Sequence, residues 1–384
     1  AEIISLSKVR AGLFFGKGVT TRLSKVNSDC NDPVVIVNTA LSPVQQRNLE
    51  MAIGVKVIDR TQLILEIFGA RAQTHAGRLQ VELAALNFQR SRLVRSWTHL
   101  ERQRGGGGFL GGPGERQIEL DRRMLMRRVS QIKLELKDVV RTRTLQRRNR
   151  VRGETPTIAL IGYTNAGKST LFNHLTGAGV LSKDMLFATL DPTMREVTLT
   201  SGRRAILADT VGFISQLPTE LIEAFKSTLE EVVHADLLLH VHDASSKFVS
   251  EDADDVVAVL SDLGLDELRQ QQCVIHVFNK ADLLEGDDQR LWLDKKYGGG
   301  VFTSARLGTG VDDLRHAIDE YLAQDSVQAV VKIKPKDGAA RAWLYEHAHV
   351  RDSRYDDRGC ETLTISISHA DHARFHARWP HLGQ

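Results

Sequence analysis

The most constraining stretch of the sequence is the glycine-rich segment 162–169, Gly-Tyr-Thr-Asn-Ala-Gly-Lys-Ser. Its spacing is that of the phosphate-binding P-loop, G-x-x-x-x-G-K-[ST]. The apolar run 157–161 before it predicts a buried strand, and residues 168–175 after it predict the start of a helix. Glycines let the backbone approach a phosphate closely, and a helix N-terminus presents N–H groups to an anion. The segment therefore predicts a nucleotide phosphate site.

Two side chains of this segment are expected to act on the phosphates directly. Lys168 adds a positive charge for the β- and γ-phosphates, and Ser169 supplies a hydroxyl that ligates Mg²⁺. The predicted phosphate-binding set is Gly162, Tyr163, Thr164, Asn165, Ala166, Gly167, Lys168, Ser169 and Thr170.

A D-x-x-G motif follows at 209–212, after the apolar segment 204–208 that predicts another strand. Asp209 is expected to hold Mg²⁺ through a water molecule, and Gly212 is expected to sense the γ-phosphate. Between them, Thr210 and Val211 complete the predicted contact with the nucleotide.

A base-recognition motif, N-K-x-D, occupies 279–282 after the predicted strand 273–278. The Asp282 carboxylate can accept two hydrogen bonds, from N1–H and from the exocyclic amine of guanine. Adenine lacks this donor pair, so the motif selects GTP over ATP. Asn279 and Lys280 belong to the same predicted contact.

The last motif of the series is Ser304, Ala305 and Arg306, which follows the predicted strand 301–303 and is expected to close over the base. All four motifs occur in the order a GTPase requires, each at a strand end. The ordered set predicts a GTP-binding domain. The alternative is a P-loop fold that no longer binds nucleotide.

Charge is distributed unevenly along the chain. The 384 residues carry a net charge of +3, but residues 89–152 contain 18 Lys/Arg and 6 Asp/Glu. That segment therefore carries +12, and subtracting +12 from +3 leaves −9 for the remainder. A basic segment on an otherwise acidic protein indicates a polyanionic partner.

Composition also bears on the compartment. No apolar run reaches the roughly 18 residues of a membrane span, and the N-terminus has no secretory signal. The three cysteines, Cys30, Cys273 and Cys360, are far apart, which favours a reducing cytosol. We expect a cytoplasmic monomer, with a peripheral membrane-associated fraction left open. The chain does not start with Met, which leaves open whether residues precede Ala1.

The predicted fold class is α/β, with four parts along the chain. They are an N-terminal α/β domain, a long antiparallel helical hairpin that is basic and has a glycine-rich tip, a P-loop GTPase domain, and a small C-terminal α+β domain. Their expected bounds are 1–72, 73–152, 153–326 and 327–384.

The outer parts are predicted in more detail from their apolar patterns. In the first, strands at 3–6, 34–37 and 55–58 with a helix at 38–51 imply a parallel sheet. In the last, strands at 330–333 and 363–367 alternate with helices at 337–347 and 369–378, as in a split β-α-β unit. His369, His372 and His376 share a face of the last helix, but no cysteine or carboxylate completes a metal-ligand set.

The hairpin is the predicted RNA-binding element. Apolar residues at helical spacing predict helices over 73–103 and about 115–150, with seven glycines among residues 105–114 between them. The tip is either a flexible linker or a probe for a narrow site in folded RNA, and the arginines are either a solvated face or an RNA-binding face. The candidate RNA contacts are Gly105, Gly106, Gly107, Gly108, Phe109, Leu110, Arg122, Arg123, Arg127 and Arg128.

Several longer stretches go beyond these general motifs. They are GYTNAGKSTLFN at 162–173, FATLDP at 187–192, DTVGFI at 209–214, ALSP at 40–43, VIDRT at 57–61, THLERQ at 98–103 and GPGE at 112–115. Together they resemble the HflX family of ribosome-associated GTPases over roughly residues 1–325.

The resemblance implies binding to the large ribosomal subunit and its rRNA, with the N-terminal and hairpin regions reaching toward the peptidyl-transferase centre. It also implies that the GTP-bound protein splits stalled or idle ribosomes, notably under heat stress. It assigns the second Mg²⁺ ligand to Thr189, where spacing alone left Thr189 and Thr193 open. The nucleotide contacts that it implies in this stretch are Phe187, Ala188, Thr189, Leu190 and Asp191.

The expected catalytic residues are Lys168, Thr189 and Gly212, with Mg²⁺ as cofactor. Many GTPases have a glutamine after the D-x-x-G glycine to orient the attacking water. Here that position is Phe213, which cannot hold water by hydrogen bonding. We therefore expect slow hydrolysis until a partner completes the site.

Two other functions stay open at this point. One is an RNA chaperone or ribosome-assembly scaffold in which GTP gates binding. The other is a GTPase that assists an RNA-modifying enzyme, although the sequence offers neither a methyl-donor site nor a redox cysteine pair.

Overall fold

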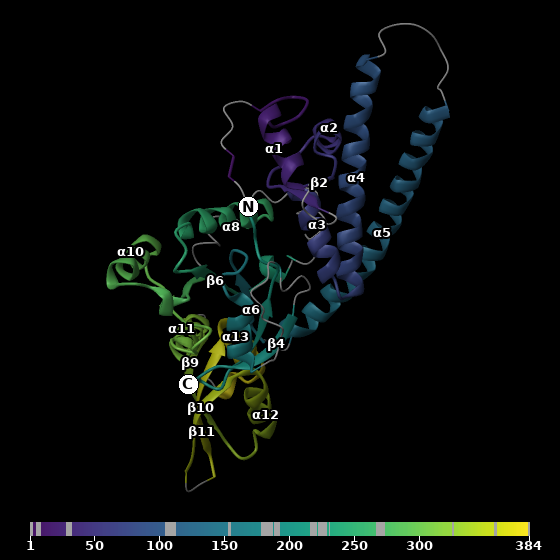
Figure 1. The fold of residues 1–384 in the computed structure, drawn as a ribbon. Helices are drawn as coiled ribbons and strands as arrows, with labels where there is room; N and C mark the ends of the chain where they lie inside the picture. The colour runs from purple at the N-terminus through teal and green to yellow at the C-terminus, as the bar shows by residue number, and fades with distance from the viewer. Residues whose placement is uncertain are drawn as a thin grey trace. The chain divides into compact units, whose positions relative to one another are not determined.

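The structure is a computed structural model. It describes residues 3–4, 9–27, 33–103, 113–152, 155–177, 187, 193–215, 221, 229, 231–265, 273–324, 326–356 and 359–382. The chain forms two compact units (Figure 1). One consists of Ala1–Val140 with Leu217–Phe225, and the other of Arg141–Gln216 with Lys226–Gln384.

The first unit begins with a small α/β fold. Its elements are α1 (Lys17–Asn27), β1 (Val34–Val37), α2 (Pro43–Ile53), β2 (Lys56–Asp59) and α3 (Arg60–Arg71). Strands β1 and β2 pair in parallel, as their alternation with a helix predicts. A capping box starts α2, because Ser42 and Gln45 each accept a hydrogen bond from the other's backbone N–H.

Three features of this fold differ from the sequence-based expectation. Ile3 and Ile4 belong to no strand, and residues 5–6 of the strand predicted there lie outside the described residues. Helix α1 was not predicted, and neither was helix α3. Helix α3 starts directly after β2 because the Asp59 carboxylate accepts a hydrogen bond from the Gln62 backbone N–H at 2.8 Å and so caps the helix.

Two long helices, α4 (His75–Gln103) and α5 (Pro113–Arg152), form the predicted helical hairpin (Figure 1). Buried apolar residues lie on both, among them Leu79 and Leu83 on α4 and Ile132 and Leu136 on α5. An ion pair between Arg128 of α5 and Glu82 of α4 ties the two helices together. The glycine-rich tip, 104–112, lies outside the described residues.

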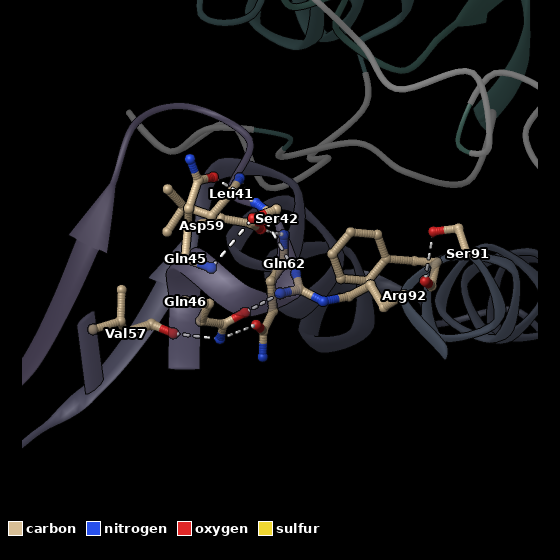
Figure 2. A network of polar contacts seen from close by, with 10 residues as sticks. Leu41, Ser42, Gln45, Gln46, Val57, Asp59, Gln62, Ser91 and Arg92 are labelled. Carbon is tan, nitrogen blue, oxygen red and sulfur yellow. Dashed lines mark hydrogen bonds and ion pairs between the residues drawn. The ribbon is translucent and has the colours of Figure 1, made fainter. Parts of the chain in front are cut away.

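A buried polar network joins the small α/β fold to the hairpin (Figure 2). The fully buried Asp59 carboxylate accepts hydrogen bonds from the backbone of Leu41 at 3.3 Å and from the guanidinium of Arg92 at 3.2 Å. Arg92 lies on α4 and also donates to the side chain of Gln46 on α2. Because a buried carboxylate is costly without partners, this pairing holds α4 against the sheet.

The second unit contains a six-stranded sheet in the order β4-β5-β3-β6-β7-β8. Only β4 is antiparallel to its neighbour. The strands are β3 (Thr157–Ile161), β4 (Thr193–Thr198), β5 (Arg204–Asp209), β6 (Leu237–Asp243), β7 (Val274–Asn279) and β8 (Val301–Phe302). The helical elements are α6 (Lys168–Thr176), α8 (Val249–Asp262), η1 (Ala281–Leu283), α10 (Asp287–Tyr297) and α11 (Val311–Gln324).

The central strands β3 and β6 are buried because both faces of a parallel sheet are covered. Leu171 and Phe172 of α6 and Leu314 and Ile318 of α11 pack in one core cluster with residues of β3, β5 and β6. The predicted strands at 157–161, 204–208 and 273–278 therefore become β3, β5 and β7 of one sheet, with β6 between β3 and β7. Their motifs meet at its carboxyl edge, where α/β proteins bind ligands.

The C-terminal part is an α+β fold in which helices and an antiparallel sheet alternate. Strand β11 lies between β9 and β10 and is antiparallel to both, so β9 and β10 run in the same direction, as in a split β-α-β unit. Strand β10 was not predicted, because its sequence is mostly polar. The elements are β9 (Ser326–Ile333), α12 (Gly338–His347), β10 (His349–Tyr355), β11 (Glu361–Ser368), α13 (His369–Arg378) and η2 (Pro380–Leu382).

Candidate functional site

The P-loop connects β3 to α6 through two glycines that no other residue could replace. Gly162 and Gly167 have φ angles of 146° and 97°. A Cβ atom on Gly162 would lie 2.2 Å from the carbonyl oxygen of Val241, and one on Gly167 would lie 2.1 Å from Nδ2 of Asn279. The backbone of β6 and the side chain of Asn279 therefore approach the loop so closely that both positions require glycine.

The Lys168 side chain is held inside the loop. Its ammonium group donates hydrogen bonds to the carbonyl oxygens of Gly162 at 2.9 Å and Tyr163 at 2.8 Å. Burial lowers the pKa of Lys168 to about 8, and the nearby Asp209 carboxylate only partly opposes this shift. The charge is therefore positioned by the backbone at the loop where the sequence predicts phosphates.

The two predicted metal ligands that the structure describes lie next to each other. The Ser169 hydroxyl donates to Oδ2 of Asp209 at 2.7 Å, and the Asp209 side chain is fully buried at the end of β5. Hydroxyl and carboxylate oxygens are the ligands that Mg²⁺ prefers. This pair fits a Mg²⁺ ion bound together with a phosphate.

The D-x-x-G segment packs directly against the P-loop. Thr210 donates to the carbonyl oxygen of Leu160 on β3 at 2.5 Å, and Val211 is buried. A Cβ atom on Gly212 would lie 2.8 Å from Cγ2 of Thr164 and 3.2 Å from Nζ of Lys168. Gly212 therefore brings its backbone close to the lysine that is expected to contact the phosphates.

Phe213 continues this contact through its backbone. Its N–H donates to the carbonyl oxygen of Gly162 at 3.1 Å, and its carbonyl oxygen accepts from the N–H of Thr164 at 2.7 Å. The ring is only 2% exposed, so it packs in the core. Tyr163 adds a side-chain link, because its hydroxyl donates to Ser215 Oγ and accepts from the Ser215 N–H, both at 3.2 Å.

Asn279 connects three motifs through its buried amide. Nδ2 donates to the carbonyl oxygen of Ala166 in the P-loop at 2.8 Å, and Oδ1 accepts from the N–H of Ala305 at 2.9 Å. This residue was predicted as a nucleotide contact. Its hydrogen bonds show that it also holds the base-recognition motif, the P-loop and the closing segment together.

The remaining base-recognition residues are more open. Asp282 lies exposed in η1, and Arg306 is exposed as well, whereas Ser304 and Ala305 are buried. Lys280 has a left-handed φ of 60°, and its ammonium group lies 2.7 Å from Oδ2 of Asp243 at the end of β6. An exposed Asp282 carboxylate is available to a base that binds at this edge.

Sequence reasoning missed Asp243 and the acidic residues of α8. A cavity of about 460 Å³ lies beside the P-loop, and its walls combine backbone donors with carboxylates. The sequence pattern that could have identified Asp243 is its position at the end of a mostly apolar strand, which it shares with Asp209. The lining residues are Tyr163, Thr164, Asn165, Ala166, Ser215, Asp243, Ser246, Phe248, Glu251, Asp252 and Asp255.

Part of the predicted site lies outside the described residues. Phe187 is described and is buried with a φ of 55°. The positions that are not described are Ala188, Thr189, Leu190 and Asp191 beside it, and Gly105, Gly106, Gly107, Gly108, Phe109 and Leu110 at the hairpin tip.

The four candidate arginines of α5 differ in their surroundings. Arg122 and Arg127 are exposed. Arg123 pairs with Glu119 one turn away on the same helix at 3.1 Å. Arg128 donates two hydrogen bonds to the carboxylate of Glu82, at 2.6 and 2.8 Å, so it fastens the hairpin.

The fold and this site define a class. The domain has a mostly parallel sheet with a P-loop after β3, a D-x-x-G segment after β5 that packs against the P-loop, and N-K-x-D at the end of β7. This combination makes it a P-loop GTPase domain. Three family models match the chain: "GTP-binding GTPase N-terminal" over residues 1–69, "GTP-binding GTPase Middle Region" over 71–150 and "50S ribosome-binding GTPase" over 157–280. The chain belongs to the HflX family of GTPases.

The relatives that support this assignment match nearly the whole chain. The GTPase HflX of Magnetococcus marinus is 47% identical over 371 residues, which cover 96% of this chain and 84% of the relative. The GTPase HflX of Escherichia coli is 42% identical over 370 residues, which cover 96% and 86%.

The comparison with solved structures gives matches at lower identity. A GTP-binding protein from the archaeon Sulfolobus solfataricus in complex with GDP is 22% identical, with a TM-score of 0.44, and the match covers 83% of this chain and 89% of that one.

Among the helices of the described residues, none combines the length and apolar character that crossing a membrane requires.

Proposed function

We propose that this protein is a GTP-driven factor that binds the large ribosomal subunit and splits stalled or idle ribosomes, notably under heat stress. The observation that carries the proposal is a guanine-nucleotide site in one unit and a basic helical hairpin in the other. A ribosomal partner is also supported by the family model for residues 157–280, which is described as a 50S ribosome-binding GTPase. The proposal places a monomer in the cytoplasm.

The hairpin face around Arg122 and Arg127 supports RNA binding. Both guanidinium groups are exposed, and the neighbouring apolar side chains Leu120, Met124 and Met126 are exposed as well. Arginines bind the phosphates of RNA, and apolar side chains pack on sugars, bases or ribosomal protein. Arg123 and Arg128 add positive charge to the same stretch, and the tip with Phe109 and Leu110 is proposed to enter a narrow rRNA site.

Magnesium is proposed to bind between Ser169, Thr189 and, through a water molecule, Asp209. The hydroxyl and carboxylate of Ser169 and Asp209, 2.7 Å apart, are oxygen donors that suit this ion. When bound, Mg²⁺ would neutralise charge that develops on the phosphates. Lys168 adds a second positive charge at the P-loop.

Hydrolysis is proposed to wait for the ribosome. Lys168, Thr189 and Gly212 are the proposed catalytic residues, because they supply charge and backbone groups at the γ-phosphate. No water-orienting glutamine follows Gly212, and the ring of Phe213 is packed in the core. Docking on the ribosome would therefore supply the group that orients the attacking water. Hydrolysis would then release the protein from the separated subunit.

Sucrose-gradient profiles of ribosomes with this protein and a non-hydrolysable GTP analogue test the proposal. We expect intact ribosomes to be lost and separated subunits to appear, with the protein on the large subunit. Lys168→Ala is the matched control, since it keeps the hairpin and weakens nucleotide binding. Binding only to immature subunits, with intact ribosomes preserved, would instead favour a GTP-gated assembly factor or RNA chaperone.

A further inference from the structure

Three histidines that belong to none of the nucleotide motifs converge at one face of the GTPase sheet. His240 and His242 alternate on β6, so both point to the same face of the sheet, and His276 on β7 lies in register with His240. The other face of β6 carries Leu239 and Val241, which belong to the main core. His240 and His242 are 3% and 4% exposed, and His276 is half-buried.

The ring nitrogens of these residues point toward one another. Nε2 of His242 lies 2.9 Å from Nδ1 of His276, and one nitrogen from each of the three rings lies within 4.8 Å of the others. Burial lowers the pKa of all three imidazoles, that of His242 to about 3. Burial therefore favours the neutral imidazole, the form that binds metal ions.

We propose that His240, His242 and His276 form a binding site for one divalent transition-metal ion of the zinc class. Three imidazoles with an open fourth position are a known zinc ligand set, and imidazole also suits copper and nickel but not magnesium. This site is separate from the proposed magnesium ligands Ser169 and Asp209.

The surroundings of the cluster define how an ion would be held. The Tyr297 ring lies 4.9 Å from the rings of both His242 and His276, and Phe278 packs beside them. His276 provides the more accessible side. The positive charges of Lys168 and Lys296 act on the cluster and oppose a cation, so we expect an anionic fourth ligand such as hydroxide.

The position of the site gives a bound ion a structural effect. It would join β6 to β7, and both strands support the nucleotide motifs. Val241, between two of the ligands, is the residue whose carbonyl oxygen leaves no room for a side chain at Gly162. Asn279 ends β7 three residues after His276. An ion here would stabilise the strand pair directly behind the P-loop.

Zinc titration of the metal-stripped, nucleotide-free full-length protein by calorimetry tests the site. The comparison is between His276→Leu and His376→Leu. The second variant is a matched control, because His376 on α13 also lies close to a second imidazole, with its Nε2 atom 3.0 Å from that of His372, but outside the proposed site. We expect His276→Leu to weaken one zinc site at least tenfold, because even loss of an outer-shell partner of a metal ligand costs about 10- to 100-fold in affinity. His376→Leu should retain that site. Equal zinc binding by His276→Leu and the parent would overturn the proposal.

Loss of GDP binding by His276→Leu would indicate that this variant does not fold. A spectroscopic measurement on a different variant then tests the site. X-ray absorption of His376→Leu with one equivalent of zinc should show three imidazole ligands at roughly 2.0–2.1 Å. Fewer than three imidazoles, or a sulfur at about 2.3 Å from Cys273 or Cys360, would place the ion elsewhere and refute the assignment.

Discussion

Individual residues of the nucleotide site have distinct tasks that their positions explain. Asn279 uses its amide to hold the P-loop and Ala305, so its contribution to nucleotide binding is through position. Asp282 lies exposed in η1, so its carboxylate is available to a base. Base selection should therefore depend on Asp282.

We predict that Asp282→Asn lowers GTP affinity by roughly 10- to 100-fold, the equivalent of losing hydrogen bonds to a charged group. The same change should favour xanthosine triphosphate, whose purine edge offers an acceptor where guanine has a donor. Nucleotide affinities measured by competition with a fluorescent GDP analogue check this. The control is Asp288→Asn in the first turn of α10, which should leave GTP affinity unchanged. An unaltered GTP affinity in Asp282→Asn would disprove the guanine assignment.

At the scale of elements, one carboxylate holds the β4–β5 turn against α11. Asp319 accepts hydrogen bonds from Thr200 Oγ1 at 2.8 Å and from the N–H and hydroxyl of Ser201 at 2.5 and 2.7 Å. Burial raises the pKa of Asp319, but these hydrogen bonds and the nearby Arg203 outweigh it, so the pKa is lowered overall. The charged form is therefore the one that stabilises the folded chain.

A pH-dependent stability difference follows for Asp319→Asn. A carboxyl group with a lowered pKa stabilises the folded state above its unfolded pKa of about 3.9 and loses that effect as pH falls through the folded value. We predict that the variant unfolds at a lower temperature than the parent near pH 7, and that the gap narrows below about pH 4. Thermal unfolding across pH checks this. The exposed Asp312→Asn on the same helix should show no such gap, and a pH-independent gap would exclude the carboxylate as its cause.

The hairpin is the second element for which a charge change gives a testable prediction, here for RNA binding. We predict that Arg122→Glu with Arg127→Glu lowers affinity for the large ribosomal subunit and flattens its salt dependence, because fewer phosphate counterions are released. GTP binding should survive. Co-sedimentation across a salt series measures the effect, with Lys334→Glu and Lys336→Glu as an exposed control of equal charge change. Identical salt curves for the parent and the hairpin variant would remove this face from the RNA interface.

At the scale of the whole molecule, the question is how ribosome binding reaches the nucleotide. Backbone hydrogen bonds already join Phe213 to Gly162 and Thr164, and the Tyr163 hydroxyl bonds Ser215. A displacement of the segment after Gly212 would therefore also displace the P-loop. If the protein acts as proposed, this linkage would connect ribosome docking to the proposed catalytic residues.

We predict that large ribosomal subunits accelerate GTP hydrolysis by roughly ten- to a thousandfold. Partner-supplied groups in other GTPases contribute about 10³–10⁵, and part of the water positioning is expected to come from this chain. Single-turnover hydrolysis with and without purified large subunits measures the factor, and small subunits serve as the control. A free protein that is already as fast as the subunit-bound one would contradict the incomplete site inferred from Phe213.

Local patterns in the sequence were enough to predict the chemistry of the nucleotide site and most of the elements around it. A P-loop, D-x-x-G and N-K-x-D each place their groups within a few consecutive residues, and β3, β5, β7 and the two hairpin helices follow from apolar periodicity. The capping box of α2 is likewise a pattern of neighbours. Such features depend on residues that are close together in the sequence, so a local pattern is enough to predict them.

Only the tertiary structure decided which distant side chains meet. Asn279 bonds Ala166 across 113 positions, Arg128 pairs with Glu82 across 46, and His242 meets His276 across 34. The polar strand β10 also has no local signal and exists because β11 pairs with it. These contacts depend on strand order, on register and on the packing of one helix against another. They arise from the free energy of the whole fold, so no local window of the sequence contains them.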